Sequence, residues 1–74
     1  VNCIAPGSVE FPGGVWDQRR LANDPLYTRT LQSIPFGRMG KPEEVASTVY
    51  RLCTADFGYV TGTEIFVTGG QHLY

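Results

Sequence analysis

The sequence predicts an α/β chain that begins and ends with a strand of a parallel sheet, with helices between the two strands. Residues 1–5 and 63–68 are short runs of β-favouring side chains, ended by Pro-Gly and Gly-Gly respectively. Between them, residues 42–53 repeat apolar side chains at the period of an α-helix. An alternation of strands and helices is typical of a parallel sheet covered by helices.

The composition is that of a globular protein. Of the 74 residues, 42% are hydrophobic and 18% are charged, which excludes a disordered chain. A chain this short buries only about 60% of its unfolded surface, so an independent core would be marginal. The net charge of −1 argues against a nucleic-acid or anionic membrane partner. With no apolar run long enough to span a bilayer, we expect no membrane partner and a cytoplasmic location.

The two cysteines, Cys3 and Cys53, lie far apart and are accompanied by a single histidine, His72. This set cannot form a zinc pattern, so we predict no metal site. Free cysteine is among the residues most often buried, which favours two buried thiols.

Residues 1–5 predict the first strand, which turns into a loop at Pro6-Gly7. Its nearly continuous apolar run indicates a strand covered on both faces. Asn2 is the exception and requires a hydrogen-bond partner. The chain opens inside this run without a methionine, which predicts that it is a piece of a longer protein.

Residues 10–34 predict a helical excursion. Residues 17–23 and 25–33 each suit a short helix, with Asp24 capping the second and Pro25 at its first position. Broken helices of this kind, placed over a pocket, form a lid.

The last helix is predicted to start at Pro42, because proline is tolerated in the first turn and Glu43 and Glu44 place negative charge at the positive end of the helix dipole. Arg38 is expected to tie the preceding loop to these glutamates. The helix is predicted to stop at residues 56–58, ahead of the strand at residues 63–68.

Four segments resemble the short-chain dehydrogenase/reductase family, and most closely its 3-oxoacyl-[acyl-carrier-protein] reductase-like members. They are residues 2–9 (NCIAPGSV), 34–46 (IPFGRMGKPEEVA), 59–62 (YVTG) and 67–70 (VTGG). The resemblance implies the C-terminal fragment of a Rossmann-type doubly wound parallel sheet. Residues 1–74 would then be the C-terminal part of a single, incomplete NAD(P)-binding domain.

The resemblance places cofactor-binding residues at Pro6, Gly7, Ser8 and Val9, at the carboxyl end of the first strand. Backbone groups of Pro6, Gly7 and Val9 would hold the nicotinamide carboxamide, and glycine would allow a close approach. The family's threonine two residues after Val9 is Phe11 here, so its polar contact would pass to Ser8 or to backbone groups. Taken alone, Pro6-Gly7 also fits an ordinary turn.

The same resemblance implies a substrate lid that contains Phe11, Trp16 and Tyr27 and that would select apolar or amphipathic carbonyl compounds. Plain packing against the sheet explains these residues equally well. Arg19 and Arg20 are expected to form a solvated face of the first short helix.

No catalytic residue is predicted in this chain. The family uses a tyrosine proton donor with a lysine four residues later, and a serine that orients the carbonyl. The only lysine here is Lys41, and Gly37 lies four residues before it. None of the nine glycines forms the phosphate-binding loop. The catalytic set is therefore expected outside this chain, and the isolated chain is expected to be inactive.

The predicted function is a part of an oxidoreductase that uses NAD or NADP and transfers hydride between the nicotinamide and a carbonyl or alcohol substrate. This part would supply the nicotinamide-side rim, the lid and the last strand, and the complete protein would be a homotetramer or dimer. One alternative is a non-catalytic interaction or oligomerisation module derived from the same fold, and another is a complete small α/β domain of unrelated function.

Overall fold

The computed structural model describes residues 1–73, and its element order agrees with the sequence prediction. Short 3-10 turns at Ala55–Phe57 and Gln71–Leu73 accompany the longer elements. In chain order the longer elements are strand β1 (Cys3–Pro6), helices α1 (Val15–Leu21), α2 (Pro25–Gln32) and α3 (Pro42–Leu52), and strand β2 (Glu64–Val67).

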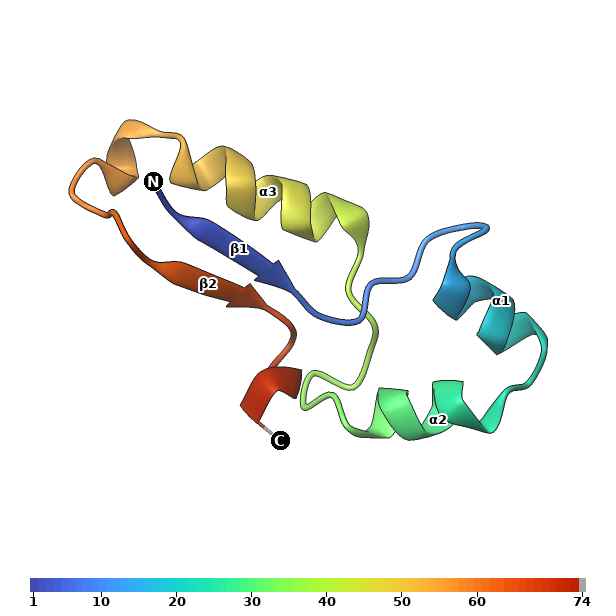
Figure 1. Cartoon of the computed structure of the whole chain (residues 1–74). Coiled ribbons are helices and arrows are strands. Elements are labelled where there is room, and N and C mark those ends of the chain that lie inside the picture. Colours follow the sequence, from blue (N-terminus) through green and yellow to red (C-terminus); the bar gives the residue numbers. More distant parts are fainter. Residues whose placement is uncertain (74) are drawn as a thin grey trace.

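Strands β1 and β2 pair in parallel, with Ile4 opposite Ile65, and α3 lies along one face of the pair (Figure 1). The start of the pair is held by Asn2. Its side-chain amide donates to the Val60 carbonyl (3.3 Å), and its side-chain oxygen accepts from the Thr63 N–H (3.0 Å). The hydrogen-bond partner predicted for Asn2 is therefore confirmed.

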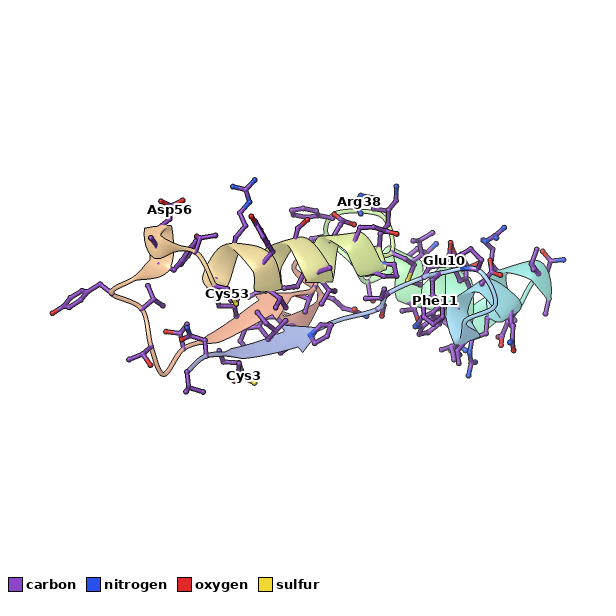
Figure 2. The ribbon with its side chains drawn as sticks, turned by 90° about the horizontal axis from the view of Figure 1, so that it is seen from above. Cys3, Glu10, Phe11, Arg38, Cys53 and Asp56 are labelled. Atoms are coloured by element: carbon purple, nitrogen blue, oxygen red, sulfur yellow. The ribbon has the colours of Figure 1, made fainter. Side chains whose placement is uncertain are left out.

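Two predictions about burial were wrong for the described residues: the two cysteines were expected to be buried, and the first strand was expected to be covered on both faces. Cys3 lies on the side of β1 away from α3 (Figure 2), and both Cys3 and Cys53 are exposed free thiols. Within residues 1–73 only one face of the strand pair carries a helix, so the other face of β1 has no covering element.

Helix α3 ends at Leu52, four residues before the predicted stop. Residues just after the helix donate hydrogen bonds to its last carbonyls. The Cys53 N–H donates to the Tyr50 carbonyl (3.1 Å), and both the N–H (3.1 Å) and the hydroxyl (2.6 Å) of Thr54 donate to the Arg51 carbonyl. Such i→i+3 bonds tighten and terminate a helix, which apolar periodicity alone does not reveal.

Helices α1 and α2 form a separate helical lobe beyond the carboxyl ends of the strands (Figure 1). The rings of Trp16 and Tyr27 join the two helices at a centroid distance of 6.5 Å, and the Arg19 guanidinium lies 5.5 Å from the Trp16 ring. Arg19 also pairs with Asp24 at 3.2 Å. The expected solvated arginine face was therefore wrong for Arg19, which helps to hold the two helices together.

The caps of these helices explain where they start. Asp24 accepts from the Leu26 N–H (2.9 Å) and Pro25 opens α2, as predicted. Helix α1 begins at Val15, two residues earlier than predicted, and the Asp17 carboxylate accepts from the Gly13 N–H (3.0 Å) in the turn that leads into it.

The buried core is small and sits where the lobe meets the sheet. Ile34 (4% exposed) and Met39 (6%) are the buried apolar residues of the described chain, and both belong to the loop between α2 and α3. No helix within residues 1–73 is long and apolar enough to cross a membrane. In the same residues, no cluster of three or more metal-ligating side chains occurs.

Candidate functional site

The candidate site lies where the carboxyl ends of β1 and β2 meet the loop between α2 and α3. The chain leaves β1 through Gly7, whose N–H donates to the Val67 carbonyl at 3.0 Å. Ligands of open α/β sheets bind at this edge. The structure therefore places the segment Pro6–Val9 at the edge of the sheet where a ligand is expected.

Gly7 is required by the contact between the two strand ends. A Cβ atom added at Gly7 would lie 3.0 Å from both Cα and Cβ of Thr68. Real Cβ atoms are rarely so close to backbone, so the absence of a side chain lets the chain cross Thr68. Gly7 therefore makes a close approach to Thr68, the residue that follows β2, and its predicted close approach to the cofactor stays a prediction.

Within the described residues, the backbone N–H and C=O of Val9 are free. It forms an isolated parallel bridge with Gly40, whose N–H donates to the Ser8 carbonyl (2.9 Å) and whose carbonyl accepts from the Glu10 N–H (2.9 Å). In a parallel ladder, bonds that straddle a residue leave its own N–H and C=O on the opposite side. Within residues 1–73 these two groups of Val9 make no hydrogen bond.

Ser8 is held from the far end of the chain. The Gln71 side-chain oxygen accepts from the Ser8 hydroxyl (3.0 Å) and from the Ser8 N–H (3.3 Å). Sequence reasoning missed Gln71, because 63 residues separate the partners and no local motif marks a glutamine as a partner of a distant serine.

The lid residues are only partly assembled. Phe11 and Tyr27 line a broad hollow of about 850 Å³ between the helical lobe and the loop before α3, together with Leu31. Trp16 does not line it and instead packs against Tyr27. Phe11 is 49% exposed, and its ring covers Gly14, where an added Cβ would approach it to 2.8 Å.

Glu10 lies beside this hollow and connects it to the lobe (Figure 2). One carboxylate oxygen is 3.7 Å from the Arg20 side chain of α1, and Arg20 in turn binds Asp17 at 2.8 Å. The other oxygen is shielded from solvent and has no hydrogen-bond partner within residues 1–73. The Glu10 carboxylate, followed by partial burial, raises the pKa of Tyr27.

The loop before α3 is fixed by the predicted arginine. Arg38 binds Glu44 through two hydrogen bonds of 2.7 and 2.9 Å, and Glu44 also accepts from the Lys41 N–H (3.0 Å). The Arg38 guanidinium, followed by the Lys41 N–H, lowers the pKa of Glu44 to about 2. Glu43 forms no ion pair within the described chain, so Glu44 alone carries this role.

Both the fold and these motifs agree with comparisons to known proteins. A family model described as "Enoyl-(Acyl carrier protein) reductase" matches residues 1–72. The chain belongs to the short-chain dehydrogenase/reductase family, as its motifs predicted, and its strands and helices are part of that family's Rossmann-type fold.

Individual relatives agree with this assignment. The chain is 38% identical over 73 residues to the 3-oxoacyl-[acyl-carrier-protein] reductase of Vibrio cholerae, which covers 99% of the chain and 28% of that protein. A short chain dehydrogenase from Bacillus anthracis is 43% identical with a TM-score of 0.79, over 100% of the chain and 26% of that structure.

A third relative was solved with a ligand. A putative 2-deoxy-D-gluconate 3-dehydrogenase from Agrobacterium tumefaciens, with bound NADP, is 33% identical with a TM-score of 0.78, over 100% of the chain and 29% of that structure. The chain thus spans between a quarter and a third of the length of these relatives.

Proposed function

We propose that residues 1–74 are the C-terminal part of a single NAD(P)-binding Rossmann-fold domain in a short-chain dehydrogenase/reductase. The complete protein would transfer hydride between a nicotinamide cofactor and a carbonyl or alcohol substrate. Support comes from the Vibrio cholerae reductase and from the Agrobacterium tumefaciens structure that holds NADP, both of which match nearly the whole chain.

The observation that carries the proposal is that the Val9 N–H and C=O have no hydrogen-bond partner within residues 1–73. A carboxamide presents one acceptor and a pair of donors, and the Val9 N–H and C=O offer the matching groups at the edge of the sheet where ligands bind. Pro6, Gly7 and Ser8 would support this segment through their contacts with β2 and Gln71. When bound, the nicotinamide ring supplies the site that accepts or donates hydride.

We assign the substrate-facing wall to Phe11, Trp16 and Tyr27. Phe11 and Tyr27 line the hollow beside the loop, and Trp16 holds Tyr27 in place across the lobe. Aromatic walls favour an apolar or amphipathic carbonyl or alcohol compound and exclude water from the reacting carbon. Phe11 has no hydroxyl, which leaves backbone groups as the polar contacts on this side of the nicotinamide.

The proton-transferring groups would come from the remainder of the complete protein. Tyr27 is the tyrosine beside the hollow, but Glu10 raises the pKa of its hydroxyl, whereas a tyrosine that exchanges protons near neutral pH needs a lowered pKa. In this proposal the isolated chain binds no substrate productively and is inactive.

Exposed apolar side chains favour a second, compatible role in assembly. Tyr50 on α3 is 73% exposed and Phe57 just beyond the helix is also exposed. Large apolar groups gathered on a surface mark contacts with further protein. We propose that the complete protein is a cytoplasmic dimer or tetramer, and that a non-catalytic interaction module is the alternative use of the same surface.

Cofactor titration of the complete protein tests the proposal. NADH or NADPH fluorescence should rise on binding, and Val9→Pro, which removes the Val9 N–H donor and replaces the side chain by a ring that fixes φ, should weaken the affinity about 5- to 10-fold. Val15→Pro is the matched control, because Val15 is the first residue of α1, where proline is tolerated. Failure to bind either cofactor would contradict the proposed function, whereas equal affinities for the wild type and Val9→Pro would contradict only the role of Val9.

A further inference from the structure

The contact between Ser8 and Gln71 joins the last turn of the described chain to the segment beside Val9. Gln71 uses one side-chain oxygen to accept two hydrogen bonds, from the Ser8 hydroxyl at 3.0 Å and from the Ser8 N–H at 3.3 Å. Ser8 and Gln71 are both partly shielded from solvent. A doubly accepting contact in such a place restricts both the rotamer of Gln71 and the backbone of Ser8.

The position of Gln71 is set by a rigid turn. Gly69 and Gly70 have φ values of 61° and 90°, and the Gln71 N–H returns to the Thr68 carbonyl at 3.1 Å. A side chain at Gly70 would lie 2.9 Å from Pro35, so the turn is packed directly against the loop before α3. The turn therefore presents the Gln71 side chain to Ser8 from a fixed base.

The C-terminal end of this turn is held by a second set of contacts. The His72 ring stacks on Phe66 at a centroid distance of 4.4 Å and an interplanar angle of 7°, and its Nδ1 lies 2.6 Å from the Thr68 hydroxyl. His72, the residue that follows Gln71, is thus held against β2. Both neighbours of Gln71 are anchored, which leaves its side chain little freedom except toward Ser8.

The consequence for Val9 is geometric. Gly40 bonds to the Ser8 carbonyl and the Glu10 N–H, so the two peptide groups that flank Val9 are bonded on the Gly40 side of the segment, while Gln71 holds the N–H of the preceding Gly7–Ser8 peptide group. The N–H and C=O of Val9 are left on the other side. Without Gln71, the Ser8 N–H and hydroxyl lose this acceptor, and the planar Gly7–Ser8 peptide group can reorient through ψ of Gly7 and φ of Ser8.

We infer that Gln71 is a positioning residue for the cofactor: it clamps Ser8 so that the free N–H and C=O of Val9 are presented to the nicotinamide carboxamide. This inference rests on the proposed function and adds to it a residue of the C-terminal turn. In this inference Gln71 acts through Ser8 and has no assigned contact with the reacting atoms.

The test compares Gln71→Met with Gln71→Glu in the complete protein. Methionine has a similar length but lacks the carbonyl acceptor, whereas glutamate keeps an oxygen that can accept both bonds. Gln71→Met breaks both bonds to Ser8 and should raise the dissociation constants of NADH and NADPH about 3- to 10-fold, the range that corresponds to the loss of one hydrogen bond between Val9 and the carboxamide. Gln71→Glu should stay within about twofold of the wild type.

Gln32→Met is the matched control, because Gln32 is an exposed residue at the end of α2 and its side chain makes no hydrogen bond within residues 1–73. It should leave cofactor affinity unchanged. Ser8→Ala provides a milder second variant. It removes the hydroxyl contact, and its effect on affinity should shrink when it is combined with Gln71→Met, because both variants break the same clamp.

Hydrogen exchange at the Ser8 amide gives a readout that does not need the cofactor, and it should become faster in Gln71→Met. If the protein binds neither cofactor, the proposed function fails, and faster exchange would show that the clamp exists without its assigned role. If the wild type binds cofactor and Gln71→Met binds it equally well, the inference on Gln71 fails and the proposed function stands.

Discussion

The Arg38–Glu44 pair ties the loop between α2 and α3 to the first turn of α3 through two hydrogen bonds. Since the pKa of Glu44 falls from 4.5 to about 2 in the folded protein, ionised Glu44 stabilises the fold above pH 4.5. This contribution is lost as the pH falls from about 4.5 to 2, where the carboxylate takes up a proton.

Glu44→Gln should therefore lower stability at neutral pH and make the loss of stability between pH 4.5 and 2 less steep. Urea unfolding of the complete protein at several pH values measures both effects. Glu43→Gln is the matched control, because the neighbouring glutamate makes no ion pair within residues 1–73. Parallel pH profiles for the wild type and Glu44→Gln would contradict the assignment.

The crossing of Gly7 over Thr68 gives a second test at a single residue. Gly7→Ala should destabilise the complete protein by about 1–3 kcal/mol, because the new methyl group meets the backbone of Thr68, just after β2, at 3.0 Å and the two segments must move apart. Denaturant unfolding measures the loss. Gly40→Ala is the control: its added Cβ would find Ser8 at 3.5 Å, an ordinary contact, so a loss as large as that of Gly7→Ala would refute the explanation.

Helix α2 depends on the side chain of Asp24, which caps its N-terminus and pairs with Arg19 of α1. Asp24→Ala removes both contacts and should cost about 1 kcal/mol, most of it from the cap. Asp24→Asn keeps a capping oxygen and weakens only the partly exposed ion pair, which contributes little. Unfolding experiments on both variants should place Asp24→Asn close to the wild type, and equal losses would assign the effect to the ion pair instead.

At the scale of the whole molecule, the chain is elongated, with extents of 45 × 26 × 16 Å and a radius of gyration of 14.2 Å. A compact domain of this length would have a radius of gyration of about 11 Å. The apolar residues Ile34 and Met39 are the buried core of the described chain. This shape supports our proposal that the chain is part of a larger domain, in which further elements would cover the open face of the sheet.

The isolated 74-residue chain should consequently lack a cooperative unfolding transition, since so little apolar surface is buried. Thermal melting followed by circular dichroism should show a shallow, continuous change and strong binding of a hydrophobic dye. The complete protein should melt sharply under the same conditions. A sharp, concentration-independent transition of the isolated chain would instead support a domain that is stable by itself.

Much of the architecture could be predicted from sequence because it rests on local signals. Pro6-Gly7 ended β1, Asp24-Pro25 started α2 and Pro42 started α3, each through backbone restrictions that neighbouring residues impose. A hydrogen-bond partner was expected for Asn2 because a polar amide stands in an apolar strand. Arg38 was expected to bind the glutamates because it precedes them closely in the sequence. The family followed from four motifs in a fixed order, and the comparisons confirmed it.

The tertiary structure alone decided which distant residues meet. The pairing of Ser8 with Gln71 and the contact of Gly7 with Thr68 depend on β1 and β2 lying side by side. The Val9 N–H and C=O are unpaired within residues 1–73 because Val9 bridges Gly40 through the peptide groups on either side of it. The tertiary structure also decided that the two cysteines are exposed, because burial of a side chain depends on which elements cover its face of the fold and not on its residue type. Local sequence fixes backbone preferences over a few residues, whereas long-range contacts are fixed by how whole elements pack.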